Sequence, residues 1–419
     1  MRRRDFLKAG AAAAAATLAG CAAAPGAAAK ARVVVVGGGY GGATAARYIR
    51  RLDPAIEVVL VEPNEAFVSC PISNMVLGGF KSMADITVPY AGLAAHGVRV
   101  VRDTATVVDP QAKQVRLAGG DTLAYDRAIV SPGVDFMWEA LPGMARAEAQ
   151  TTVLHAWKAG PQTQMLRRQL EAMPDGGVFV LSIPEAPYRC PPGPYERACQ
   201  VAAYFKAAKP RSKVLLLDAN GDVISKGALF KKAWSELYRD IIEYRPNSKA
   251  VDVDAPARVV KLEFGDVKGD VLNVLPPMKA GSVAAPFITV NRRWCEVDWI
   301  TYESKAAPGV HVLGDSLQIA PLMPKSATMA NGHGKVCAAA VVALLNGQAP
   351  NPSPTLINTC YSMVSDKLAI HVSTVHKYDE KDRTMKTVPG SGGLSAGRNE
   401  LEGAYAMSWA KNIWEDALA

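Results

Sequence analysis

Cysteines are the residues of this 419-residue chain best suited to redox chemistry. Six of its seven cysteines lie beyond residue 29, namely Cys70, Cys190, Cys199, Cys295, Cys337 and Cys360. None belongs to a CxxC pair, and no nearby histidine completes the spacing of a metal site. The spacing therefore predicts no metal centre and leaves thiol and disulfide chemistry open.

Cys190 stands in an unusual turn. It follows GGVFVLSIP, which is typical of a buried strand, and precedes YERACQVAAYFKAA, which has a helical pattern. In a dinucleotide-binding unit this turn is glycine-rich, because a pyrophosphate needs bare backbone N–H groups. Here it reads PEAPYRCPP, and proline has no N–H. The sequence predicts that this unit binds no nicotinamide cofactor, and that the helix start favours the thiolate form of Cys190 by lowering its pKa.

An earlier turn has the glycines that this one lacks. The run VVVVGGGYGG predicts a buried strand that ends at Gly37, Gly39 and Gly42, ahead of a helical pattern. The next predicted strand, IEVVLVE, ends in Glu62. This order is typical of a dinucleotide site, where the glycines admit the pyrophosphate to the helix N-terminus and the acidic residue accepts hydrogen bonds from a ribose.

Two more segments indicate which dinucleotide binds. Gly314 and Asp315 follow the strand pattern GVHVL and precede a long helical run, and Ser131, Pro132 and Gly133 follow the strand pattern DRAIV. Both segments resemble motifs of the glutathione-reductase-like flavoproteins. The resemblance implies FAD, with the aspartate holding the ribityl chain and the helix pointing its positive end at the flavin ring.

The order of these motifs predicts an α/β fold with two Rossmann-like domains and a smaller C-terminal α+β domain. The expected limits are residues 1–29 for a leader, 30–141 and 279–349 for a split FAD-binding domain, 142–278 for an inserted NAD-domain-like unit without a nicotinamide motif, and 350–419 for an interface domain. Trp409 and Trp414 are candidates for that interface, with ordinary packing as the alternative.

Six short segments carry a closer resemblance, namely HAWKAG, CPPGPYERA, WCEVD, MPKS, NTCYS and AYAMSWAKNI. They are similar to the flavoprotein subunit of flavocytochrome c sulfide dehydrogenase, over essentially the whole chain beyond the leader. The resemblance implies that Cys190 and Cys360 form a redox-active disulfide beside the flavin, and that Cys70 links the FAD covalently. The sequence SCPISN around Cys70 lacks the aromatic residue more typical of the family, and a buried, unlinked thiol is the alternative.

The same resemblance implies the reaction. Sulfide opens the disulfide, a persulfide forms, and two electrons pass to FAD and then singly to a separate c-type cytochrome subunit. This chain has no CxxCH motif and is expected to bind no haem itself. Glu196 is a candidate for moving a proton of hydrogen sulfide, and a solvated residue of a first helical turn is the alternative. Lys325 is a candidate for stabilising negative charge at the reduced flavin, and a surface lysine is the alternative.

The N-terminus predicts export. RRRDFLK and the alanine-rich stretch after it have the twin-arginine signal pattern, with a cleavage site near Ala29, and predict a periplasmic protein. The segment LAGC ending at Cys21 resembles a lipobox, so Cys21 is either lipidated or removed with the leader. The net charge of +8 falls to a mildly basic value without the leader, and neither nucleic-acid binding nor a later membrane span is expected.

Three other functions stay open. A sulfide:quinone oxidoreductase has the same scaffold and similar cysteines, but it needs a membrane-facing amphipathic C-terminus, whereas Glu415 and Asp416 make this tail acidic near its end. A NADH-dependent flavoprotein reductase would need the glycines that the Cys190 turn lacks. A non-catalytic FAD-bearing electron-transfer or binding subunit would have no use for Cys190 and Cys360.

Overall fold

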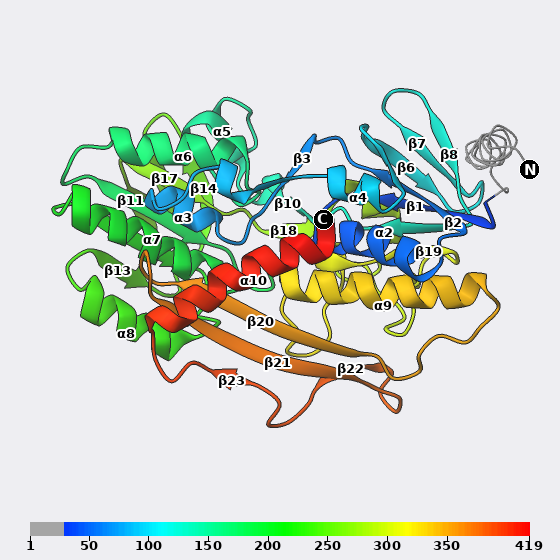
Figure 1. Cartoon of the computed structure of the whole chain (residues 1–419). Coiled ribbons are helices and arrows are strands. Elements are labelled where there is room, and N and C mark those ends of the chain that lie inside the picture. The colour runs from blue at the N-terminus through cyan, green and yellow to red at the C-terminus, as the bar shows by residue number, and fades with distance from the viewer. Residues whose placement is uncertain (1–28) are drawn as a thin grey trace, which may run out of the picture.

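Figure 1 shows the computed structural model of the chain, which describes residues 29–419. The predicted export signal and Cys21 lie outside the described residues. Two units with parallel sheets stand side by side, and a C-terminal unit lies along both of them. The predicted fold class, α/β with two Rossmann-like units and a smaller α+β unit, is confirmed.

The first sheet contains the glycine motif. Its five strands are arranged in the order β19, β9, β1, β2, β5, and all neighbouring strands are parallel. They are β1 (Ala31–Val36), β2 (Ile56–Val61), β5 (Val98–Val101), β9 (Arg127–Val130) and β19 (Val310–Val312). The valines of β1 are buried, as is typical of a parallel strand. Since β19 pairs with β9 from beyond the inserted unit, two distant parts of the chain complete one sheet.

Helices α2 (Tyr40–Leu52) and α9 (Ala327–Leu345) pack closely against each other in this unit. A glycine makes the close approach possible. A Cβ atom at Gly334 of α9 would lie 2.6 Å from the carbonyl oxygen of Gly41 and 3.0 Å from the Cβ of Thr44 on α2. The position of α9, whose N-terminus reaches the cavity described below, therefore depends on a residue without a side chain.

The inserted unit has a second parallel sheet, in the order β13, β12, β11, β17. Its elements are α6 (Pro161–Ala172), β11 (Val178–Ile183), α7 (Gly193–Ala208), β12 (Lys213–Asp218), α8 (Gly227–Leu237), β13 (Ile242–Arg245) and β17 (Val271–Val274). A short antiparallel pair, β10 (Val134–Phe136) with β18 (Met278–Ala280), joins the chain entering the unit to the chain leaving it.

The C-terminal unit is an antiparallel sheet with one long helix. It consists of β20 (Thr355–Met363), β21 (Ala369–Asp379), β22 (Thr384–Thr387), β23 (Gly393–Leu394) and α10 (Glu400–Leu418). Figure 1 shows α10 crossing from the inserted unit toward α2. At its end, the Tyr48 hydroxyl of α2 donates a hydrogen bond to Asp416 at 2.7 Å, so the last helix is fixed to the first unit.

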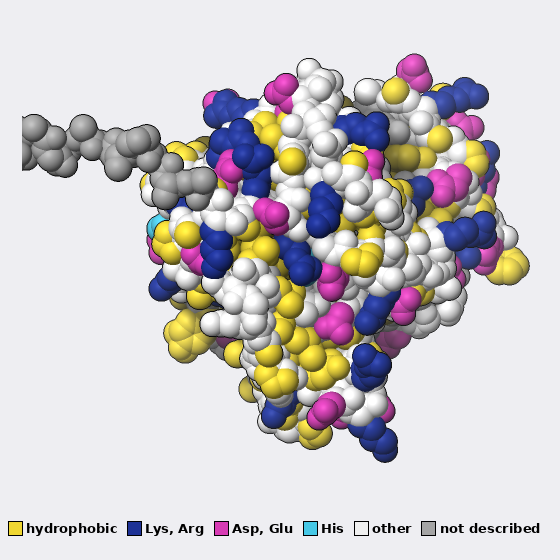
Figure 2. Space-filling view, turned by 90° about the vertical axis from the view of Figure 1, so that its right-hand side faces the viewer, with side chains coloured by type: hydrophobic (Ala, Val, Ile, Leu, Met, Phe, Trp, Pro, Cys, Tyr) yellow, Lys and Arg dark blue, Asp and Glu magenta, His cyan; other side chains and the backbone are white. Residues whose placement is uncertain are grey.

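Shorter elements complete the structure. They are β3 (Ala66–Val68), α3 (Ser73–Gly78), β4 (Thr87–Pro89), α4 (Ala91–Ala95), β6 (Ala105–Asp109), β7 (Gln114–Leu117), β8 (Thr122–Ala124), α5 (Ala149–Thr152), β14 (Ala250–Asp254), β15 (Val259–Leu262) and β16 (Gly265–Lys268). None of the helices within residues 29–419 has the length and apolar character of a membrane span. The face in Figure 2 carries interspersed charges of both signs, and no field of a single sign dominates it.

The packing of α2 on α9 gives a stability prediction. Gly334→Ala should lower the free energy of unfolding by about 1–3 kcal/mol, because the added methyl group meets the backbone of α2. Urea denaturation measures the change. Gly332→Ala is the matched control on the same helix, since its Cβ meets only the end of the Leu356 side chain, at 3.1 Å. The control should be neutral or stabilising through helix propensity, and equal destabilisation by both variants would contradict the account.

Candidate active site

One cavity of about 300 Å³ lies where the three units meet. Residues of the first unit, of the inserted unit and of β20 line it together. Among the residues singled out by the sequence, the lining includes Gly37, Gly39, Glu62, Cys70, Ser131, Pro132, Gly133, Cys190, Glu196, Gly314, Asp315 and Cys360. Gly42 and Lys325 are not part of the lining. The fold thus collects residues from very distant parts of the chain around a space of ligand size.

The glycine turn lines the cavity, and it leaves no room for a side chain at Gly37 or Gly42. Gly37 has a φ of +97°, and a Cβ there would lie 2.4 Å from the carbonyl oxygen of Ser131. A Cβ on Gly42 would lie 1.9 Å from the carbonyl oxygen of Gly37, so Gly42 serves helix–strand packing instead of lining the cavity. Within this turn, the backbone N–H of Gly38 donates a hydrogen bond to Glu62 at 2.8 Å.

The start of helix α9 and the segment of Asp315 give the cavity features that a flavin needs. Helix α9 begins after Ser326, whose hydroxyl accepts a hydrogen bond from the N–H of Met329, and its first residues line the cavity. The positive end of the α9 dipole therefore faces the space. Asp315 lies beside it, and burial raises the pKa of this carboxyl group. Bare backbone at the glycine turn, two acidic residues in the lining, Glu62 and Asp315, and a helix N-terminus fit FAD, so these residues would hold the cofactor.

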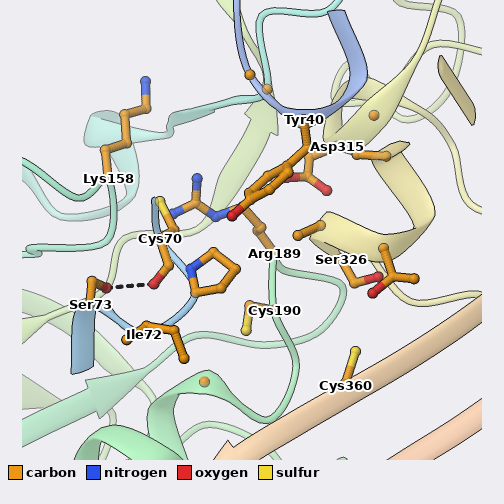
Figure 3. Close-up of a pocket in the computed structure, with 18 of the residues that line it drawn as sticks. Tyr40, Cys70, Ile72, Ser73, Lys158, Arg189, Cys190, Asp315, Ser326 and Cys360 are labelled. Atoms are coloured by element: carbon orange, nitrogen blue, oxygen red, sulfur yellow. Dashed lines mark hydrogen bonds between the residues drawn. The ribbon is translucent and has the colours of Figure 1, made fainter. Parts of the chain in front are cut away.

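Cys190 and Cys360 reach the same cavity from different units, as Figure 3 shows. Cys190 stands just before α7 with a φ of +56°, and its N–H donates a hydrogen bond to the carbonyl oxygen of Lys325 at 2.9 Å. Cys360 lies on β20. A Cβ at Gly193 would lie 3.0 Å from the Cys190 sulfur, so a glycine is needed there. Both cysteines are half-buried free thiols in the structure.

The predicted acidity of the Cys190 thiol is wrong. Burial raises the pKa of Cys190, and the nearby Cys360 and Glu196 add to this, while the positive charges of Arg189 and Lys226 oppose it without overcoming it. The prediction relied on a helix start at the cysteine, but α7 begins only at Gly193. Burial also raises the pKa of the Cys360 thiol, and Lys226 is the first of the groups that lower it.

Cys70 lies in the loop after β3, at the other side of the cavity from Cys360 in Figure 3. Its sulfur accepts a hydrogen bond from the N–H of Ala159 at 3.4 Å, and the Ser73 hydroxyl donates to its carbonyl oxygen at 2.6 Å. The loop is thus fixed to the inserted unit with the half-buried thiol facing the cofactor space. This position is compatible with either a linked or an unlinked flavin.

Glu196 is buried in the first turn of α7, with only 8% of its surface exposed, so the alternative of a solvated residue is wrong. Its carboxylate accepts hydrogen bonds from the N–H of Met363 at 3.0 Å and from the amide of Asn74 at 3.2 Å. Burial raises the pKa of Glu196. The group lines the cavity near both cysteines and can exchange a proton there nearer to neutral pH than an exposed carboxyl group can.

Lys325 is also buried, at 3% exposure, so the alternative of a surface lysine is wrong. Its ammonium group does not face the cavity. It donates to the carbonyl oxygens of Asp315, at 2.8 Å, and Leu317, and lies 3.6 Å from the centre of the Trp294 ring. Burial lowers the pKa of Lys325 to about 7. In the structure Lys325 supports the Asp315 loop and the Cys190 turn, and stabilisation of negative charge at the reduced flavin by its ammonium group stays a prediction.

The two C-terminal tryptophans face inward. Trp409 lines the cavity, and the indole N–H of Trp414 donates a hydrogen bond to the hydroxyl of Tyr40 at 3.0 Å. Both side chains pack against a small apolar cluster that includes Ile72. Internal packing, the alternative to an exposed interface, therefore describes them.

Two arginines at the site were missed by the sequence analysis. Arg197 is buried, and its guanidinium donates hydrogen bonds to the side chains of Asn74 and Asn273 and to two carbonyl oxygens. Arg189 lines the cavity between Cys70 and Cys190 in Figure 3. Their presence in the segment CPPGPYERA and the residue before it was the only available signal, because every partner of Arg197 comes from another element.

Side chains of the inserted unit occupy the place where a second nucleotide would bind. Asp218 ends β12 as an acidic residue would in a nucleotide site, but the hydroxyls of Tyr195 and Tyr244 donate to its carboxylate at 2.8 and 3.0 Å. The Tyr188 side chain is buried in the preceding turn. Asp218 therefore has internal partners in place of a ribose.

Together, the fold and the cavity define a flavoprotein oxidoreductase with two Rossmann-like units, and residues 31–170 match the family model "Pyridine nucleotide-disulphide oxidoreductase". Residues 163–276 match "Sulfide dehydrogenase (flavocytochrome c) flavoprotein chain, central", and residues 352–418 match "Flavocytochrome c sulphide dehydrogenase, flavin-binding". The chain belongs to the family of flavoprotein chains of flavocytochrome c sulfide dehydrogenase. Membership makes it an FAD-dependent oxidoreductase that acts on sulfide.

Individual relatives agree with this family. The sulfide dehydrogenase flavoprotein chain of Chlorobaculum thiosulfatiphilum is 69% identical over 37 residues, which are 9% of this chain and 77% of that sequence. The mitochondrial sulfide:quinone oxidoreductase of Mus musculus is 24% identical over 315 residues, 70% of this chain and 67% of that one. Among solved structures, the sulfide:quinone oxidoreductase of Aquifex aeolicus has a TM-score of 0.75 at 16% identity, covering 92% and 91% of the two chains, and shares the fold.

Proposed function

We propose that this chain oxidises sulfide at a redox-active disulfide formed by Cys190 and Cys360, and that its electrons leave through FAD to a c-type cytochrome. The observation that carries the proposal is the convergence of both cysteines on the cavity that has the FAD-binding features. Both thiols line this cavity, and Cys360 is near enough to add to the raised pKa of Cys190. Bound FAD supplies the two-electron acceptor.

The first step is thiol–disulfide exchange. Hydrosulfide attacks one sulfur of the pair, a new S–S bond forms as a persulfide, and the Cys190–Cys360 bond breaks with its electron pair on the other sulfur. Glu196 takes the proton when hydrogen sulfide enters in its neutral form, since burial raises the pKa of this carboxyl group toward the working range. Arg189 lines the cavity and supplies a positive charge that attracts the hydrosulfide anion.

The choice of a cytochrome as the electron acceptor is more specific than the oxidation of sulfide by an FAD enzyme. It is supported by membership of a flavocytochrome c family and by the predicted twin-arginine signal, since a periplasmic protein meets soluble cytochromes. The chain has no CxxCH motif of its own, so the haem would lie on a separate subunit. A quinone acceptor is the second candidate, because relatives over most of the chain are sulfide:quinone oxidoreductases.

The cysteine pair is tested by three single variants. Cys190→Ala and Cys360→Ala should each slow the reduction of bound flavin by sulfide by at least about a hundredfold, because neither leaves a disulfide to open. Anaerobic stopped-flow absorbance of the flavin measures the rate. Cys199→Ala is the matched control, a buried thiol outside the cavity, and should keep the unaltered rate. Normal reduction in either of the first two variants would contradict the mechanism.

Covalent attachment of FAD to Cys70 is also proposed, from the position of this thiol at the cavity and from the family resemblance. Acid precipitation of the unaltered protein should leave the flavin in the pellet, whereas Cys70→Ala should release it to the supernatant. Cys295→Ala, which changes a buried thiol outside the cavity, should behave as the unaltered chain. A yellow supernatant from the unaltered protein would exclude the thioether.

The acceptor is tested after reduction by sulfide. A soluble c-type cytochrome should re-oxidise the flavin faster than a short-chain quinone at equal concentration, because the proposal assigns electron exit to a haem partner. Stopped-flow recovery of the oxidised flavin spectrum gives both rates. Faster recovery with the quinone would favour the second candidate and would leave the chemistry of the cysteine pair unaffected.

A further inference from the structure

Lys226 is a buried cation beside the cysteine pair that the sequence analysis did not single out. It lies between β12 and α8, directly before the first residue of α8, and only 5% of its surface is exposed. Its backbone has a φ of +59°, a left-handed conformation that a lysine rarely adopts. Both the burial of the charge and the backbone conformation are unfavourable, so the surrounding structure must hold this residue in place.

The contacts of the ammonium group tie it to the strand of Cys360. It donates a hydrogen bond to the carbonyl oxygen of Cys360 at 2.9 Å and another to the hydroxyl of Ser362 at 2.7 Å. Its nearest aromatic contact is the ring of Phe230, with 5.7 Å to the centroid. Within residues 29–419 no carboxylate lies within 4 Å of this ammonium group, so its charge is not neutralised by an ion pair.

The other ionisable groups that act on Lys226 come from four elements. They are Glu196 on α7, Glu402 on α10, Cys190 in the turn before α7 and Cys360 on β20, and Cys360 has the largest effect of the four. Burial lowers the pKa of Lys226 to about 8, so the group is predominantly charged at neutral pH. Glu196 accepts its hydrogen bonds from the N–H of Met363 and the amide of Asn74, and the ammonium group of Lys226 donates to the strand of Cys360 instead.

We propose that Lys226 is a positioning residue that places the negative charge of the reduced cysteine pair on Cys360. Two electrons and one proton convert the disulfide into one thiol and one thiolate. The cation attached to the Cys360 backbone makes that sulfur the thiolate and leaves Cys190 as the thiol. The proposal rests on the proposed function only in taking the pair as redox-active, and it adds which of the two sulfurs carries the charge.

The asymmetry of the site supports this assignment. Lys226 is the foremost of the groups that lower the pKa of Cys360, whereas its effect on Cys190 ranks behind that of Arg189. The segment that carries Lys226 also belongs to the inserted unit, in which Asp218 has internal tyrosine partners. The segment between β12 and α8 therefore supplies, through Lys226, a positive charge next to the cysteine pair.

Alkylation of the reduced protein tests the proposal without sulfide. The FAD-loaded chain is reduced with dithiothreitol, freed of it anaerobically and treated with iodoacetamide from pH 6 to 10, and peptide mass spectrometry gives the rates at Cys190 and Cys360. Only the thiolate reacts, so the rate follows the thiolate fraction. In the unaltered chain, Cys360 should react at the lower apparent pKa.

Lys226→Met should raise the apparent pKa of Cys360 by about one unit, which is about tenfold slower alkylation below that pKa, and should change Cys190 much less. Lys226→Arg keeps the positive charge, so its alkylation profile should match that of the unaltered chain. If Lys226 acted only through packing, the profile would not follow the charge at this position. Far-ultraviolet circular dichroism and flavin absorbance verify folding, and Ser362→Ala, which removes one hydrogen-bond partner of the ammonium group, should shift the profile in the same direction by less.

Two results would overturn the proposal. One is alkylation of Cys190 at a lower pH than Cys360 in the unaltered chain, a comparison that needs no variant. The other is an unchanged Cys360 profile in folded Lys226→Met. A chain that shows the predicted profiles but does not oxidise sulfide would refute the proposed function and leave the role of Lys226 standing, so the two failures are distinguishable.

Discussion

Everything at this site depends on holding β20 against the turn that carries Cys190, because the two cysteines are 170 residues apart in sequence. Buried polar contacts between helix α7 and the end of β20 hold these two elements together. The carboxylate of Glu196 accepts the N–H of Met363, and the amide of Gln200 donates to the carbonyl oxygens of Met363 and Ser365. A buried donor or acceptor that loses its partner destabilises the fold by about 1–3 kcal/mol, so each of these contacts opposes separation of the units.

The inserted unit keeps the architecture of a nucleotide-binding domain but has a different use for it. Its first turn presents a cysteine where bare backbone would admit a phosphate, and its acidic strand-end residue, Asp218, is bonded to two tyrosines. Helix α7 brings Glu196 to the cavity, and the segment before α8 brings Lys226 to the backbone of Cys360. The nucleotide site of the first unit retains its glycines and Glu62, so one chain contains both a cofactor cradle and a sulfur site.

Features of the fold and the site that depend on local sequence were predictable. The glycine turn with Glu62 and the parallel strands of both units depend on short segments, and the family segments bring Cys190 and Cys360 into consideration. Properties set by tertiary contacts were not predictable. The thiol pKa of Cys190 was misjudged because burial outweighs a helix that starts only at Gly193. The direction of the Lys325 side chain and the role of Lys226 depend on carbonyl oxygens that only the folded chain supplies.

In the mechanism that we propose, the Cys190–Cys360 pair stores electrons next to the flavin. An anaerobic titration of the unaltered, oxidised protein with dithionite counts the electrons that one chain accepts. The account predicts two electrons for the flavin and two more for the disulfide, with a pair of new thiols at Cys190 and Cys360 when the titration ends. A titration that ends after the flavin alone, with no new thiol at either cysteine, would contradict it.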